Sequence, residues 1–304
     1  MTTDSGRSEF EGLARQLEES GDYRVLRRFV PPGRYAESDS LPHGTAIALD
    51  IETTGLDPRT DIIIQVSVVA FEYSAETGRI FEVSTPVTYF ENPGRSIPPD
   101  VVKMTGITDA DVAGKRIDDQ AVAALVRAGG LVVAHNAVSD RPFLERRLPV
   151  FQDVPWACSM AEVPWRNLGY ASLAEEYLLL KHCGLFYDAH RADRDALAMI
   201  HLLATPFESG ELPFRLLLQS ARLRTLRIWA VGAPFDAKDT LKVRGYRWNP
   251  GDDGRPKAWH RDVSEEDQTA ELAWLREQVY GGRNGPWHLE SFDARKRYSA
   301  RIGL

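Results

Sequence analysis

The sequence predicts an α/β fold, a mixed β-sheet flanked by helices, with a short N-terminal helical arm and a second, smaller α+β unit. Three observations predict it. Residues 46–52, 61–73 and 79–90 are β-branched and apolar runs separated by turn-forming residues, which is typical of consecutive strands. Helical patterns then alternate with the short apolar run 131–135, which indicates a mixed sheet. A new series of short strand and helix patterns begins after residue 225.

The element patterns divide the chain into three parts. Residues 1–44 hold a short amphipathic helix, which we expect to end at Gly21, and a Pro- and Gly-containing connector that we expect to pack on the main domain. Residues 45–220 form the main domain. Its expected helices are, in order, 109–113, 118–128, 140–148, 172–183 and 191–204. The length of 304 residues is compatible with one large domain and a smaller companion.

Residues 221–304 are predicted to form the small α+β unit and a tail. A strand at 227–232 and a helix at 236–245 precede two strand patterns that flank the turn 250–255. A last helix begins at Ser264 and ends at Gly281-Gly282. The partly basic tail from residue 282 is expected to be loosely ordered.

Composition indicates a globular protein of a reducing compartment. The chain is 43% apolar and 27% charged, which permits a packed core and argues against wholesale disorder. Its two cysteines, Cys158 and Cys183, predict neither a disulfide framework nor a structural zinc site. The sequence has no apolar run long enough for a membrane span and no signal-peptide pattern at its start. We therefore expect a soluble, cytoplasmic protein without a membrane partner.

The net charge of -7 is unevenly distributed. Residues 221–304 hold 16 Lys and Arg against 12 Asp and Glu, whereas residues 1–220 hold 21 against 32. An acidic body thus carries a basic C-terminal segment. Acidic groups gathered in a site can bind divalent metal, and a basic segment can follow a phosphate backbone.

Two carboxylates share one face of the first predicted strand. In residues 46–52, alternation places Ala46, Ala48, Asp50 and Glu52 on the same side. Neighbouring carboxylates at the end of an apolar strand repel each other and lose hydration, unless a cation or a proton compensates. A divalent metal is the natural compensator. The alternative is that Asp50 begins a turn and Glu52 is solvated, which is the commoner case for an isolated pattern of this kind.

Two further segments present polar groups near helix starts. Asp140 follows the run 131–134, with Pro142 expected in the first turn of the next helix. His190 precedes a later helix, and Asp195 lies on the helix face expected to pack on the sheet. Taken singly, Asp140 is interpreted more simply as a helix cap and His190 as a surface residue.

Together, Asp50, Glu52, Asp140, His190 and Asp195 resemble the motifs of the DEDDh exonucleases, the superfamily that includes the proofreading subunit of bacterial replicative polymerase. The similar blocks are LDIETTGLDPRTDIIIQVSVVAF, MTGITDADV, AHNAVSDRPFL and HRADRDALA, in the order and spacing of that family. The resemblance covers about residues 45–205. It departs at Ser139, where the family often has an aromatic residue.

The resemblance implies an RNase H-like fold and 3′–5′ hydrolysis of phosphodiester bonds, which releases nucleoside 5′-monophosphates. It implies two Mg²⁺ or Mn²⁺ ions, and such hard cations prefer oxygen ligands. Asp50, Glu52 and Asp195 are expected to ligate metal, and Asp140 to bind one ion directly or through water. His190 is expected to be the general base, because the ordinary imidazole pKa suits proton transfer at neutral pH.

Residues of two regions are expected to contact substrate. The resemblance suggests Thr54, Leu56, His135 and Asn136 near the terminal nucleotide. The alternatives are that Leu56 is core and Asn136 caps a turn. In the C-terminal unit, basic residues interleaved with aromatics suit single strands. The candidates there are Lys238, Lys242, Arg244, Arg247, Lys257 and Arg261. Tyr246 and Trp248 alternate onto one face, and the favoured interpretation is that they form the core of the unit.

Three functions remain open on the sequence alone. The leading hypothesis is an exonuclease that acts on DNA 3′ ends in repair or proofreading, with a polymerase or repair protein as a partner. The second keeps the enzyme and changes the substrate to RNA ends or short oligoribonucleotides. The third is a catalytically silent subunit that binds nucleic acid or a polymerase. The four retained carboxylates argue against the third, since a silent site has no reason to keep their repulsion.

Overall fold

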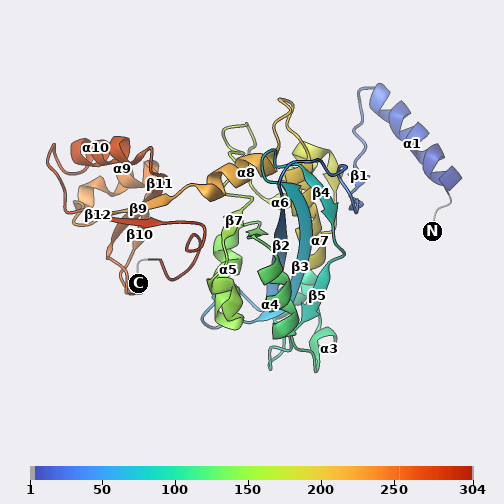
Figure 1. Ribbon diagram of the computed structural model, residues 1–304, viewed down its shortest axis with the longest axis horizontal. Coiled ribbons are helices and arrows are strands. Elements are labelled where there is room, and N and C mark those ends of the chain that lie inside the picture. Colours follow the sequence, from blue (N-terminus) through green and yellow to red (C-terminus); the bar gives the residue numbers. More distant parts are fainter. Residues whose placement is uncertain (1–3, 253, 303–304) are drawn as a thin grey trace.

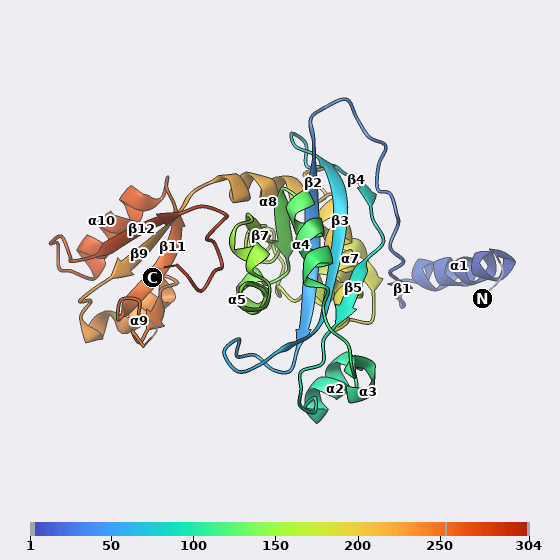
Figure 2. The same ribbon diagram turned by 60° about the horizontal axis from the view of Figure 1, so that its bottom comes forward.

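The structure is a computed structural model that describes residues 4–252 and 254–302. A six-stranded main sheet occupies the centre of an elongated molecule (Figure 1). A small C-terminal unit lies on one side of it, and the N-terminal helix extends away on the other (Figure 2). The fold is therefore mixed α/β with an additional C-terminal sheet, as the sequence predicts.

The main sheet has the strand order β4-β3-β2-β6-β7, and β5 also pairs with β3. Its strands are β2 (His43–Thr53), β3 (Ile63–Ser74), β4 (Ile80–Val83), β5 (Val87–Phe90), β6 (Leu131–Ala134) and β7 (Trp156–Cys158). The pairs of β3 with β2, β4 and β5 are antiparallel, whereas β6 is parallel to β2 and to β7. The third predicted strand is wrong as a single element, because it is interrupted around Pro86, which cannot donate to the ladder.

Helices cover both faces of this sheet (Figures 1 and 2). The helices of the main domain are α2 (Pro99–Thr105), α3 (Asp109–Val112), α4 (Asp119–Ala128), α5 (Ala137–Arg147), α6 (Glu175–Leu178), α7 (Ala192–Ala204) and α8 (Pro213–Arg222), with single turns at Pro149–Gln152 and Leu179–Cys183. Of these, α2 and α3 lie beyond one end of the sheet (Figure 2). Because side chains alternate along β2, the strand contributes to two hydrophobic cores, one on each face of the sheet. Ala46 and Ala48 pack with Met199 of α7, whereas Ile47 and Leu49 pack on the opposite face. Asp50 and Glu52, which continue the first series, therefore face the α7 side.

The N-terminal arm differs from expectation. Helix α1 (Asp4–Glu19) ends close to the expected Gly21, but its apolar residues Phe10, Leu13 and Leu17 are exposed. Ion pairs from Arg27 to two of its glutamates connect the helix to the connector. The connector itself packs on the main domain, where β1 (Arg27–Arg28) pairs with β8 (Leu185–Phe186).

The C-terminal unit is an antiparallel sheet of order β10-β11-β9-β12 with helices on one face. Its elements are β9 (Thr225–Ala230), the turn Phe235–Ala237, α9 (Lys238–Val243), β10 (Arg247–Asn249), β11 (Ala258–Ser264), α10 (Gln268–Gln278) and β12 (His288–Phe292). Tyr246 is buried in its core as predicted, but Trp248 is 48% exposed, so its assignment to the core is wrong. Trp248 lies on the edge strand β10, where its ring is 5.6 Å from the ring of Trp259.

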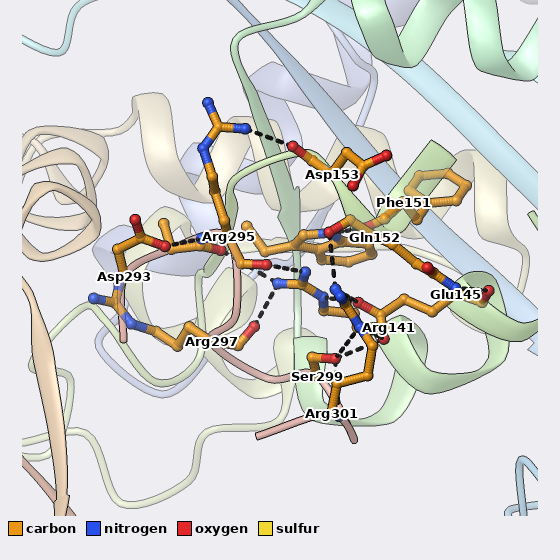
Figure 3. Close-up of polar contacts among 12 residues, drawn as sticks. Arg141, Glu145, Phe151, Gln152, Asp153, Asp293, Arg295, Arg297, Ser299 and Arg301 are labelled. Atoms are coloured by element: carbon orange, nitrogen blue, oxygen red, sulfur yellow. Dashed lines mark hydrogen bonds and ion pairs between the residues drawn. The ribbon is translucent and has the colours of Figure 1, made fainter. Parts of the chain in front are cut away.

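The tail, residues 293–302, returns to the main sheet instead of being loosely ordered. Arg141 of α5 is fully buried and donates to the carbonyl oxygens of Ala294, Arg295 and Arg297 (Figure 3). Arg141 also pairs with Glu145 at 2.8 Å, and Arg301 of the tail donates to the same carboxylate at 3.0 Å. The tail therefore supplies the acceptors that a buried guanidinium requires.

Among the described residues, no helix combines the length and apolar character that crossing a membrane requires.

Candidate active site

Asp50 and Glu52 lie near the end of β2, on the face that α7 covers. They are opposite Ser67 and Gln65 of β3, and the register shifts directly after Glu52. That irregularity ends the regular pairing where the two carboxylates project. Glu52 is only 7% exposed. The alternative of a solvated Glu52 is thereby excluded.

Asp195 comes to the same place from the first turn of α7. Oxygen atoms of Asp50, Glu52 and Asp195 all lie within 4.8 Å of one another. The Arg191 backbone N–H donates to Asp195 Oδ2 at 2.7 Å, and the Tyr187 hydroxyl donates to Oδ1 at 2.8 Å. The position of Asp195 is therefore fixed from both sides.

Asp140 faces this group from α5. It is 5% exposed, and its negative charge raises the pKa values of Asp50 and Glu52. The helix that carries it begins at Ala137, so Asp140 lies within the helix and is not its cap. Pro142 likewise lies in the helix interior instead of the first turn, which corrects the predicted boundary.

The four carboxylates resist ionisation in the absence of a cation. Burial, followed by repulsion from Asp195 and Asp140, raises the pKa of Glu52 to about 8. Burial raises the pKa of Asp140 to about 8, and burial with repulsion from its neighbours raises the pKa of Asp50 well above the usual range. Burial also raises the pKa of Asp195. Clustered buried carboxylates with this property are a donor set suited to a hard divalent cation.

His190 stands at the rim of the group. It is exposed, precedes α7 and has a backbone φ of 65°, which few residues other than glycine adopt. It lies close enough to Asp195 to offset part of the rise that burial causes in the pKa of that carboxyl. Within residues 4–252 and 254–302, no hydrogen bond holds the imidazole. Its side chain is therefore exposed beside the carboxylates and unrestrained by a hydrogen bond.

The four residues expected near the terminal nucleotide differ in their exposure and in their hydrogen bonds. Leu56 is 90% exposed, which excludes the alternative that it is core. Asn136 has a left-handed backbone, and its side chain caps no helix. The buried Thr54 hydroxyl is engaged with Asp61, Arg95 and the Ile62 N–H.

His135 is also held inside the protein. Its Nε2 donates to the Leu173 carbonyl oxygen at 2.8 Å, so that Nδ1 accepts from the Ser159 hydroxyl at 2.8 Å. Burial lowers the pKa of His135 to about 4, and the ring is neutral at physiological pH. We interpret His135 and Thr54 as supports of the site and Leu56 and Asn136 as the groups available to a ligand.

Sequence reasoning missed two residues beside the carboxylates. The side chain of Glu175 is 11% exposed, and burial with repulsion from Asp195 raises its pKa. The Tyr187 hydroxyl oxygen lies 3.2 Å from Glu175 Oε1 while it donates to Asp195. Neither residue stands in a recognisable motif. Only the fold brings the start of α6 and the segment before α7 together.

Known proteins similar to this chain share the segment that holds these residues. A protein-family profile described as Exonuclease matches residues 47–203. The DNA polymerase III subunit epsilon of Treponema pallidum is 33% identical over 171 residues, which cover 54% of this chain and 76% of that protein. The DNA polymerase III PolC-type of Clostridium perfringens is 29% identical over 167 residues, which cover 53% of this chain but 11% of that protein.

Among solved structures, the zinc-bound E. coli ExoI–ssDNA complex aligns with a TM-score of 0.47 and 17% identity. The alignment covers 73% of this chain and 63% of that one. The family match contains Asp50, Glu52, Asp140, His190 and Asp195 and ends before the C-terminal unit.

Proposed function

This chain belongs to the exonuclease family, and on that premise we propose that it hydrolyses phosphodiester bonds from the 3′ end of DNA and releases nucleoside 5′-monophosphates. The observation that supports this most is the convergence of Asp50, Glu52 and Asp195 within 4.8 Å, with Asp140 beside them. We propose residues 45–220 as the catalytic domain.

The carboxylates are the residues that would hold divalent cations. Asp50, Glu52 and Asp195 supply oxygen atoms at spacings suited to a shared ligand, and Asp140 adds a fourth carboxylate. Two Mg²⁺ or Mn²⁺ ions, when bound, would stabilise the negative charge that develops on the phosphate. The raised pKa values of Asp50 and Glu52 support the fit, because a bound cation offsets the repulsion that, after burial, contributes to them.

His190 would accept a proton from the attacking water at a ring nitrogen. Its exposure and its place next to Asp195 leave the imidazole free to approach a phosphate held over the carboxylates. Tyr187 and the Arg191 N–H would keep Asp195 oriented during the reaction. The exposed Leu56 would pack on the terminal base, and Asn136 would contact the same end of the strand.

Two parts of the proposal extend beyond the catalytic residues. DNA is favoured over RNA because the Treponema pallidum relative is a DNA polymerase III subunit, and this chain matches 76% of its length. RNA ends remain the alternative substrate, since no described contact reads a 2′-hydroxyl. Association with a polymerase or repair protein stays a prediction.

Digestion of 5′-labelled oligonucleotides tests the proposal. Wild type, Asp50→Asn and the control Glu72→Gln, which changes an exposed carboxylate of β3, are incubated with single-stranded DNA, matched and 3′-mismatched duplex, and RNA. Mg²⁺, Mn²⁺ or EDTA is present. We expect a ladder that shortens from the 3′ end in wild type and Glu72→Gln, and none in Asp50→Asn or EDTA. Folded wild-type protein that cleaves no substrate would refute the proposal.

A further inference from the structure

A cleft of about 770 Å³ separates the C-terminal unit from the main sheet. On one side it is lined by Asn136 and Val138 at the start of α5, and on the other by residues of β9, β10 and β11. Tail residues, including Arg297 and Tyr298, line it as well. The cleft thus extends from the start of α5, the helix that carries Asp140, to the sheet of the C-terminal unit.

The strand register shows which face of the small sheet borders the cleft. Arg247 is opposite His260, and His260 is opposite Trp229, so these side chains share a face. Leu226, Ile228 and Val263 point to the other face, where they form a core with Leu275 of α10. One face of the sheet is therefore packed on helices, and the other presents polar residues to the cleft.

Arginine dominates the charge of the cleft. Its lining includes three carboxylates, Glu162, Asp262 and Asp267, and twice as many arginines: Arg224, Arg227, Arg247, Arg255, Arg261 and Arg297. Three of these arginines are held by carboxylates at 2.7 Å: Arg227 by Asp262, Arg297 by Glu162, and Arg261 by Glu271. Arg247 is exposed and Arg255 is partly exposed, and Arg224 is exposed in a surface ion pair with Glu265 at 3.4 Å, which water and a competing phosphate can reach.

The environment of His260 agrees with the excess of arginines over carboxylates in the lining of the cleft. Burial, with Arg227, Arg255 and Arg247, lowers the pKa of His260 to about 4 against the opposing effect of Asp262. At His260 the effect of these arginines therefore exceeds that of Asp262, although the whole chain carries a net charge of -7. A polyanion is the ligand chemistry that matches such a cleft.

We propose that this cleft binds single-stranded nucleic acid 5′ to the end that is hydrolysed, with Arg247, Arg255 and Arg224 on its phosphates. The inference rests on the proposed function, because the direction of the strand is set by the carboxylates. A volume of about 770 Å³ lies in the range of small-ligand sites. It accommodates a few nucleotides of one strand and is too small for a duplex.

This proposal changes the set of basic residues that the sequence suggested. Lys238, Lys242, Arg244 and Lys257 do not line the cleft, whereas Arg247 and Arg261 do. Lys238 lies over the Phe235 ring at 4.6 Å. Arg244 and Arg261 both bind Glu271, which is 2% exposed, so they stabilise the packing of α10. The phosphate contacts therefore move from α9 to the sheet and the turn that follows β10.

Fluorescence anisotropy with 5′-labelled dT15, rU15 and a 15-base-pair duplex tests the cleft. All proteins carry Asp50→Asn, and EDTA is present, so binding is measured without hydrolysis. Arg247→Ala/Arg255→Ala is compared with Lys238→Ala/Lys242→Ala on α9. The control is Arg276→Ala/Arg283→Ala, which removes the same charge from exposed positions of the unit outside the cleft.

We expect the cleft double variant to weaken dT15 binding roughly tenfold or more and to reduce the salt slope by about 1.4, since each contact to a single strand contributes about 0.7. The control should change neither. A larger loss in the α9 variant, equal losses in all three, or preferred binding of the duplex would overturn the cleft proposal. Comparable losses for dT15 and rU15 would leave the cleft in place and assign the choice of sugar to the active site.

The two proposals fail separately. Wild type that binds dT15 through the cleft but hydrolyses nothing contradicts the proposed function alone. Wild type that hydrolyses DNA, while the cleft double variant binds like the control, contradicts the cleft alone.

Discussion

The Tyr187 hydroxyl donates a 2.8 Å hydrogen bond to Asp195 Oδ1, and the Arg191 N–H holds the other oxygen of that carboxylate. Tyr187 is 9% exposed. Asp195 therefore has a fixed orientation that does not depend on a ligand. The tyrosine contributes a positioning contact that no sequence motif announces.

Tyr187→Phe removes only this hydroxyl. A hydrogen bond to a charged group contributes roughly 1.5 to 3 kcal/mol, so we expect kcat to fall at least tenfold while KM changes little. Steady-state kinetics on labelled DNA measures both. Tyr170→Phe is the control, because its hydroxyl contacts His182 at 2.9 Å, away from the carboxylates. Equal losses in the two variants would exclude a specific role for Tyr187.

The metal-free protein should become less stable as pH rises. The folded-state pKa values of Glu52 and Asp140 are raised to about 8, so between about pH 4 and pH 8 the folded protein binds more protons than the unfolded chain. Stability then falls with pH across that window and levels off above it. Thermal unfolding in EDTA at pH 5.5 and 8.5 measures the effect.

Divalent cations and removal of one charge should both oppose this trend. We expect Mn²⁺ at pH 8.5 to raise Tm in wild type by mass action and to have a smaller effect on Asp50→Asn. Asp50→Asn itself should be more stable than wild type in EDTA at pH 8.5, because it relieves repulsion. A wild-type Tm that rises with pH in EDTA contradicts the electrostatic description of the site.

Arg141→Ala should destabilise the fold by about 3 to 5 kcal/mol, the range for breaking a buried ion pair. The substitution leaves tail carbonyls without their donor and opens space beside Trp156, whose ring lies 5.3 Å from the guanidinium. Urea unfolding measures the loss. Arg127→Ala, at an exposed position of α4, is the control and should change stability by less than about 1 kcal/mol. A similar change in both variants shows that the tail contacts do not stabilise the fold.

Leu56→Ala should leave stability unchanged, because the side chain is 90% exposed. We expect KM for DNA to rise roughly three- to tenfold, since the lost apolar contact with a base is worth about 1 kcal/mol. Met104→Ala, another exposed apolar residue at 51%, should not change KM. An unchanged KM in Leu56→Ala would show that Leu56 does not pack on the terminal base.

The part of the site that follows from local pattern was predictable. Alternation along one strand places Asp50 and Glu52 together, and helical spacing places Asp195 on the buried face of α7. Glu175 and Tyr187 were not predictable, because neither stands in a periodic pattern that indicates its partner. The same holds for the strand interrupted around Pro86, whose two apolar halves give one continuous signal.

Long-range packing explains the other errors. Arg141 contacts residues more than 150 positions away, so nothing near it indicates that the tail would be ordered. Trp248 follows the alternation of a core residue but lies on an edge strand, where no further strand covers it.

The C-terminal unit is fastened to the main sheet at two places, through the covalent link from α8 into β9 and through the returning tail. A trypsin cut after the exposed Arg283 would leave β12 and the tail as a separate peptide that is still paired with β9 and locked around Arg141. Nicked protein should therefore elute from gel filtration as one species and separate into two fragments only in denaturant. Because two connections hold the small unit, it does not rotate freely about either one. The width of the cleft is therefore fixed when the protein folds, before a ligand binds.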